Sequence, residues 1–501
     1  MANNHLIGKQ VLELNISTSK NAYAIQQRVS DLVWKAFLPE ICALFDTLVG
    51  EEEVLQLDSI VIDLGEVDIK EANIPTVLDA MTQLLEKECS NSIAEIRGRE
   101  FEDAKPQAKG QLPLRQHYFQ LWLHWLEFGT LPSYANVPKE NWLEKVFETL
   151  GLEDAAIQRL QAVLIQNSIA LRRLILQHKA KELKSLVELY TGYSQSKLLN
   201  FFKELSKAYK HGIIMNLKVG YRELEVALWQ IIFQKVILRR EKLTSETIAA
   251  LLMGCKELST FRTNFKSQRK HNNTKYPILS TALKDAKINL KSDLKKEVLP
   301  TEGLAKETLD NEESAYQKNV EPQKIVSENL LDTTASPQFI KKAGMVLLHP
   351  FLSKLFRKLK LAEDGAFNDF KSQCKAVLLL RFLAGGENMG KDFELLLPKI
   401  LCGMPANLPL DHTLKLSKKE KKEANNLLKA VIDHWGALGS TSPDGLREGF
   451  LIREGKLTKE ESGRKLYVEQ KAIDVLLDRL PWNLSMIKLP WMKELLYVEW
   501  R

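Results

Sequence analysis

The residues that could do chemistry are scattered along this sequence. His117 and His124 lie seven residues apart, close to two helical turns, so both imidazoles could face one side of a helix. A zinc site needs at least a third protein ligand, and none follows at a suitable spacing. We therefore interpret the two histidines as partly buried aromatic side chains, and we expect no metal site.

Acidic residues gather at two places where carboxylates could act together. Asp474 and Asp478 are one helical turn apart in the stretch DVLLDRL, but this pattern is typical of the wet face of an amphipathic helix. The other group lacks the spacing of a calcium loop, so we interpret its members as solvent-facing acids on an alternating strand. That group comprises Asp58, Asp63, Glu66 and Asp68.

The sequence motifs of common enzymes are missing. The chain has no GxGxxG, Walker A, HExxH, GxSxG or CxxC pattern. His349 stands beside Pro350 on an apolar segment, which predicts a packed or capping histidine and not a catalytic base. We therefore expect a protein that is not an enzyme and that uses no cofactor.

Length and composition set wide bounds on the fold. A chain of 501 residues is too long for one ordinary core and predicts about three domains. The net charge of +7 is spread over the whole length, which is weak support for nucleic-acid binding. No signal peptide and no apolar run of the ~20 residues that span a bilayer is found, so we expect no membrane insertion. Five scattered cysteines predict reduced core residues of a cytosolic protein: Cys42, Cys89, Cys255, Cys374 and Cys402.

Residues 341–501 contain a series of elements with clear start and stop signals. Four helices are predicted. One begins at Pro350, a second covers Phe367–Ala384, a third follows the capping box of Ser417 with Glu420, and a fourth covers Ala472–Leu480. The stretches Phe450–Leu457 and Arg464–Gln470 predict a hairpin, and the last twenty residues hold two more strand candidates. The many aromatic residues near the end predict a docked terminus. We expect Trp482 in the core and propose Trp491, Tyr497 and Trp500 as protein-docking residues, with Trp500 partly exposed.

Several phrases of this region resemble a known family. They are VLLHPFL (346–352), ELLLPKILCGMP (394–405), AVIDHW (430–435), GLREGFLIREGKL (445–457), DVLLDRLPWNLSMIKLPWM (474–492) and LYVEW (496–500). In this order they are similar to the C-terminal region of the tape measure proteins of contractile injection systems, which are phage-tail-like particles made by bacteria. The resemblance covers most of 343–500.

The first hundred residues predict a small α/β domain. Val11–Ile16 and Val54–Asp68 alternate as strands, and a long helix between them runs past Pro39, which should bend it. The phrases KQVLEL, FLPEI and LDSIVIDLG also resemble the N-terminal region of the same family. Residues 101–261 are helical throughout, with a stop at FGTLP. The family typically continues GTLP with two tryptophans, whereas Ser133-Tyr134 follows here.

Residues 262–340 differ in composition and predict a disordered, charged linker. Residues 262–296 have ten Lys or Arg against two Asp or Glu, whereas 297–340 have three Lys against nine Asp or Glu. An ordinary solvated linker explains this, and so does compaction or charge matching on a tube wall. The run Lys415–Glu423 is interpreted as a solvated helix face. The predicted fold class is thus α+β and mostly helical, with parts 1–100, 101–261, 262–340 and 341–501.

The resemblance implies a structural tape measure that occupies the lumen of the inner tube and sets tube and sheath length. Its partners would be the tube, spike or baseplate and cap proteins, first in the bacterial cytoplasm and then inside the particle. The alternative is a baseplate or cap adaptor that binds folded partners and measures nothing. Nucleic-acid binding through 262–296 is a third hypothesis, which few aromatic residues support.

Overall fold

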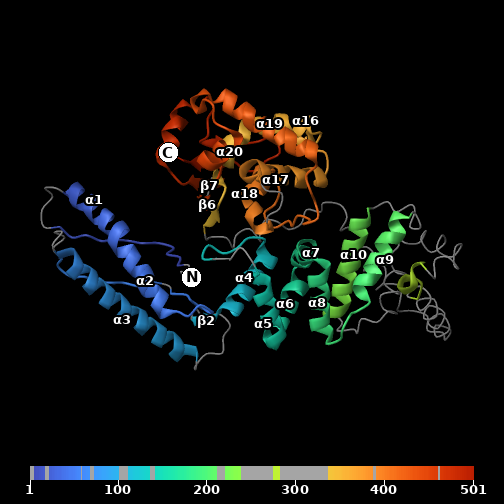
Figure 1. Ribbon diagram of the computed structural model, residues 1–501, viewed down its shortest axis with the longest axis horizontal. Coiled ribbons are helices and arrows are strands. Elements are labelled where there is room, and N and C mark those ends of the chain that lie inside the picture. The colour runs from blue at the N-terminus through green and yellow to red at the C-terminus, as the bar shows by residue number, and fades with distance from the viewer. Residues whose placement is uncertain are drawn as a thin grey trace, which may run out of the picture. The chain divides into compact units, whose positions relative to one another are not determined.

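The structure is a computed structural model that describes most of the chain (Figure 1). The chain is mostly helical with small sheets, as the sequence predicts. It forms two compact units, one of residues 1–123 and 133–156, the other of residues 124–132 and 157–501. The division into four parts stays a prediction. The described residues are 5–16, 22–57, 59–67, 73–100, 111–135, 141–211, 220–238, 275–281, 337–386, 391–460 and 463–500.

The long helix predicted near the N-terminus is present as three consecutive pieces. Helix α1 (Ala22–Leu32) continues into a π-helical turn, η1 (Val33–Phe37), and then into α2 (Leu38–Leu48). Pro39 lies in the first turn of α2 and has no N–H to donate to the turn before it. The irregular turn therefore stands where the sequence predicts a disturbance of the helix.

A second long helix completes this part of the first unit. Helix α3 (Ile74–Glu100) packs along α2, as Figure 1 shows, and was not predicted. The two helices enclose a small core, to which α1 and η1 contribute. Its buried members are Val29, Val33, Phe37, Val77 and Met81.

The strands predicted in the first hundred residues are mostly wrong. The described stretch Val11–Ile16 forms no strand, and within Val54–Asp68 only the start belongs to one. This is β1 (Glu53–Leu55), which pairs antiparallel with β2 (Gln111–Pro113). An alternating pattern predicts two different faces, but a strand also needs a neighbouring strand, which the pattern does not supply.

In the described residues of the predicted helical middle, the chain after β2 forms a series of short helices. The stop at FGTLP is also confirmed, because α4 ends directly before Gly129, whose φ is +81°. Asn167 caps α7 by accepting hydrogen bonds from the N–H groups of Ile169 and Ala170. The helices are α4 (Leu114–Phe128), α5 (Trp142–Leu152), α6 (Asp154–Gln166), α7 (Ser168–Gln177), α8 (Ala180–Thr191), α9 (Leu198–Lys210), α10 (Tyr221–Phe233) and η3 (Gln234–Leu238).

The helices of the C-terminal region follow their predicted signals. Ser417 and Glu420 form the predicted capping box, in which Glu420 N–H donates to Ser417 Oγ at 3.2 Å. Gly386, whose backbone is in the left-handed conformation with a φ of +68°, ends α17 (Phe370–Gly385). The elements are η5 (Ala343–Leu348), α16 (His349–Lys358), α17 (Phe370–Gly385), η6 (Asp392–Leu395), α18 (Leu396–Leu401), α19 (Lys418–His434), η7 (Gly436–Leu438), α20 (Pro443–Leu446), η8 (Arg447–Leu451) and η9 (Ala472–Arg479).

A five-stranded mixed sheet lies beside these helices, with the strand order β3-β6-β7-β9-β8. The predicted hairpin is confirmed as β6 and β7, although its first strand begins at Gly455 because Arg447–Leu451 form a π-helical turn. Strand β9 pairs parallel with β7 and antiparallel with β8. The strands are β3 (Gln338–Ile340), β6 (Gly455–Glu460), β7 (Gly463–Val468), β8 (Met486–Ile487) and β9 (Leu496–Glu499), and β4 (Ala362–Glu363) pairs with β5 (Ala366–Phe367).

Most of the predicted linker, residues 262–340, lies outside the described residues. Its described parts are ordered. Tyr276 and Leu279 are buried, and Tyr276 shares a hydrogen bond with His211 Nδ1 at 2.7 Å. Strand β3 pairs with β6, so the C-terminal fold begins before residue 341.

Buried histidines in the helical part should make stability depend on pH. Burial lowers the pKa of His117, His124 and His178 to about 4 each. Below pH 6.5 the unfolded chain binds protons that the folded chain does not, so stability falls as the pH falls towards 4. The His117→Gln variant lacks this loss. Relative to wild type, its free energy of unfolding should therefore rise by about 2 kcal/mol when the pH falls from 7 to 5. Urea unfolding at both pH values measures it, and parallel pH profiles would contradict the buried neutral state.

Candidate functional site

Trp500, proposed from the sequence as an exposed docking residue, lies in the core. Only 4% of it is exposed, and it shares the inward face of β9 with Leu496 and Val498. Its indole N–H donates to Asp474 Oδ2 at 3.2 Å. Trp482, expected in the core, is only half-buried and packs against the core through Phe351. The relative burial of these two tryptophans is therefore the reverse of the expectation.

Asp474 is the residue that holds the C-terminal strand in place. Its carboxylate accepts hydrogen bonds from Trp500, from Lys471 N–H at 2.8 Å, and from Arg453 Nη2 at 2.8 Å. The Arg453 side chain is fully buried and also donates to the Gly449 carbonyl. The prediction that Asp474 lies on the wet face of its helix is therefore wrong, because a buried arginine requires a buried carboxylate. Asp478, on the same helix, is exposed as predicted.

Trp491 also acts within the fold. Its indole N–H donates to the Leu401 carbonyl at 2.8 Å, and its ring lies 4.9 Å from that of Phe367 and 5.4 Å from that of Phe356. At Gly403, whose φ is +62°, a side chain would collide with the Trp491 carbonyl oxygen. Trp491 therefore braces the chain end against helices α16 and α18.

Tyr497 is the one predicted docking residue that lies on an open face. It is half-buried and points away from Trp500, because successive residues of a strand face opposite sides. Directly paired residues share a face, so Tyr497 lies beside Lys465 and Met486. We call this surface the outer sheet face. Its members are Phe339, Lys456, Thr458, Lys465, Tyr467, Met486, Tyr497 and Glu499.

The outer sheet face combines apolar and charged groups. Phe339 and Met486 are each 55% exposed. Lys465 lies 4.6 Å from the centre of the Tyr467 ring and 2.9 Å from Glu499. Exposed aromatic and methionine side chains with charged groups around them are typical of a protein-docking surface. The three predicted residues thus do not form one patch, since two of them brace the sheet that presents the third.

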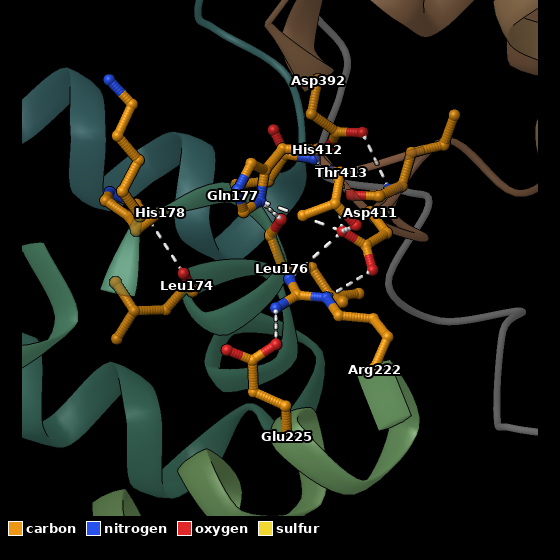
Figure 2. Close-up of polar contacts among 12 residues, drawn as sticks. Leu174, Leu176, Gln177, His178, Arg222, Glu225, Asp392, Asp411, His412 and Thr413 are labelled. Atoms are coloured by element: carbon orange, nitrogen blue, oxygen red, sulfur yellow. Dashed lines mark hydrogen bonds and ion pairs between the residues drawn. The ribbon is translucent and has the colours of Figure 1, made fainter. Parts of the chain in front are cut away.

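A second cluster, which the sequence did not reveal, joins helices α7 and α10 to the loop 405–413 (Figure 2). Arg222 binds Asp411 with two hydrogen bonds of 2.7 and 3.1 Å, and Arg222 also pairs with Glu225 at 2.9 Å. The backbone N–H and Nδ1 of His412 both contact the Leu176 carbonyl at the end of α7. Gln177 Nε2 donates to the Leu410 carbonyl. The loop is therefore held at three consecutive residues.

Beneath this loop lies a buried group of charges around Asp392. Lys399 Nζ lies 2.8 Å from one carboxylate oxygen, and Arg173 Nε lies 3.6 Å from the other. All three side chains are at most 1% exposed. Burial lowers the pKa of Arg173 to about 10 and lowers the pKa of Lys399 as well. Two cations thus share one carboxylate in a site without water contact.

Backbone carbonyl groups accept further hydrogen bonds from these cations. Arg173 donates to the carbonyls of Leu126 and Asn407, and Lys399 donates to that of Ala406 at 3.2 Å. A side chain at Gly129 would lie 2.7 Å from Arg173 Nη2, which gives this glycine a second role besides ending α4. We call Arg173, Asp392 and Lys399 the buried charge group. A signal for it was present in the sequence, because Arg173 and Lys399 are charges inside apolar runs.

The other candidate residues have structural roles. His349 Nδ1 lies 3.0 Å from the Val346 carbonyl, and burial lowers its pKa. The run Lys415–Glu423 is solvated at its lysines, but Glu420 is buried and pairs with Lys375 at 2.6 Å. Asp63 and Glu66 are exposed, whereas Asp58, Asp68 and Cys255 lie outside the described residues. The described cysteines are free: Cys42, Cys89, Cys374 and Cys402.

Two further properties concern only the residues that the structure describes. No group of three His, Cys, Asp or Glu side chains among them could hold a metal ion. None of the helices in this part of the chain is both long enough and apolar enough to cross a membrane.

The charged groups in these clusters bind other parts of the same chain. The chain belongs to the contractile injection system tape measure protein family, whose model matches residues 4–500. This family is structural and not enzymatic. No curated protein and no solved structure matches the chain.

The burial of Trp500 leads to a stability prediction. Trp500→Ala removes a buried ring and leaves Asp474 with one hydrogen bond fewer, so we expect a loss of ~3–5 kcal/mol. Tyr497→Ala, on the outer sheet face, is the matched control and should cost roughly 1 kcal/mol. Urea unfolding of the full chain measures both losses. A Trp500→Ala variant as stable as wild type would contradict the core assignment.

Proposed function

We propose that this chain occupies the lumen of the inner tube before firing and sets how far the tube and sheath grow. The observation that carries the proposal is the family match, which covers residues 4–500. A ruler needs two ends that are held and a stretch between them that sets the distance. The partners are then the tube, the spike or baseplate, and the cap of the particle.

The C-terminal fold is suited to be one of the held ends. Buried hydrogen bonds fix Trp491 and Trp500 to its core, so the last strand is a firm support. This support presents Tyr497 on the outer sheet face, where exposed Phe339 and Met486 add apolar area. We therefore propose that a particle component docks on this face, with Tyr497 in contact and with Trp491 and Trp500 as braces.

The distance has to come from the middle of the chain. If opened into one continuous helix, residues 101–261 would span at most ~240 Å. In the structure, the described part of this region is divided into short helices, of which α4 has 15 residues. The predicted linker 262–340 would add at most ~270 Å when fully extended. A ruler of this size corresponds to a short tube.

The adaptor hypothesis uses the same docking face without any measurement. It explains a firmly built C-terminal fold equally well, since an adaptor also needs a rigid surface. The two hypotheses differ in what the middle of the chain does. A ruler makes the particle length depend on the number of residues, whereas an adaptor makes it independent of that number.

Deleting Lys291–Glu328 tests the measuring role. These 38 residues, counted from 291 to 328 inclusive, span at most ~130 Å when extended, so we expect particles shorter by up to that amount. The control replaces the same stretch by a shuffled sequence of equal length and composition, which should leave the length unchanged. Electron microscopy of assembled particles gives the length distribution. Normal lengths in the deletion variant would favour the adaptor.

A further inference from the structure

The N-terminal segment 6–16 exposes an unusual amount of apolar surface. It belongs to no helix or strand, has a bend at Gly8, and exposes every one of its residues. Soluble monomers seldom leave such a run of apolar side chains open to water. The exposed fractions of its large apolar residues range from 43% to 65%, and these residues are Leu6, Ile7, Val11, Leu12, Leu14 and Ile16.

Other parts of the same unit also expose apolar side chains. Val61 is 80% exposed on another segment, 59–67, whose Leu64 packs on the core between α1 and α3. Tyr23 and Trp34 on the adjoining helix are 73% and 70% exposed. A stable interface needs ~800 Å² from each partner, so a partner would cover several of these side chains and not segment 6–16 alone.

The sequence of segment 6–16 indicates its partner, because the segment is complementary to a second copy of itself. In an antiparallel pair centred on Val11, each residue faces the one at an equal distance on the other side of residue 11. Lys9 then faces Glu13, which places opposite charges together twice. Leu6 faces Ile16 in the same register, and Val11 faces its own copy.

The two faces of such a pair also differ as a half-buried strand requires. The even positions supply Leu6, Leu12, Leu14 and Ile16, which form one apolar face. The odd positions supply both Lys9–Glu13 pairs and Asn15 beside the apolar Ile7 and Val11, so they form the more polar face. An unpaired extended segment with open N–H and C=O groups is a ready template for a second strand.

We propose that residues 6–16 pair antiparallel with residues 6–16 of a second copy of this chain, across a two-fold axis at Val11. The contact is isologous, so the same surface is used on both copies. Segment 59–67 of each copy lies beside the pair. The dimer then has four strands, two from each copy. A two-stranded sheet is marginal in water, and four strands with an apolar face are stable.

Charge reversal in the full-length chain tests this register. Wild type should sediment as a species of twice the 57.2 kDa of one chain. Lys9→Glu and Glu13→Lys each place two like charges opposite each other, so each variant alone should dimerise at least tenfold more weakly. The double variant should dimerise like wild type, and a mixture of the two single variants should form heterodimers.

Two controls make the result specific. Lys429→Glu reverses an exposed charge on α19 and should leave the dimer unchanged. Val11→Cys should form a disulfide-linked dimer on oxidation, because facing residues in a pair lie within disulfide distance, whereas Val475→Cys, 58% exposed elsewhere, should not. A wild-type chain of single mass, a dimer indifferent to both reversals, or a double variant without rescue would overturn the proposal.

Discussion

The second compact unit depends on the buried carboxylate of Asp392. It is the counter-charge for Lys399 in α18 and for Arg173 in α7, two residues that lie far apart in the sequence. Removing one partner of a buried ion pair typically costs several kcal/mol, because a charge is then left without water and without a counter-charge. Both cations also hold backbone carbonyls, at Leu126, Ala406 and Asn407. The end of α4, helix α7 and the loop 405–413 therefore have to be in place together.

The chain end uses the same kind of support on a smaller scale. Asp474 accepts hydrogen bonds from Arg453, Lys471 and Trp500. It thereby connects the end of β9 to helix η9. Because these polar contacts point inward, the opposite face of the sheet stays open around Tyr497. In the proposed function, this rigid support with its open face would be one held end of the ruler.

Local signals in the sequence predict the local elements well. The capping box at Ser417, the stop at Gly129 and the β6–β7 hairpin are confirmed, because each depends on a few neighbouring residues. The N-terminal strands are wrong because a strand depends on a partner.

Contacts between distant residues could not be predicted in the same way. Asp411 and Arg222 are separated by 189 positions, and nothing in either neighbourhood identifies the other. The burial of Asp474 was missed for a related reason. An amphipathic pattern predicts that a carboxylate faces solvent. A buried arginine from elsewhere in the chain can instead require that carboxylate to be buried as its counter-charge. The charges inside apolar runs, Arg173 and Lys399, were the available signal that buried ion pairs exist.

The coupling through Asp392 is tested most directly by hydrogen exchange of the full-length Asp392→Asn variant. If the carboxylate joins α7 to α18 and the loop 405–413, amide exchange should become faster in all three segments. The free energy of opening should fall by the same amount in each, at most ~3–5 kcal/mol. Exchange in α3 of the other compact unit should stay as in wild type. An increase confined to one of the three segments, or none at all, would contradict the coupling.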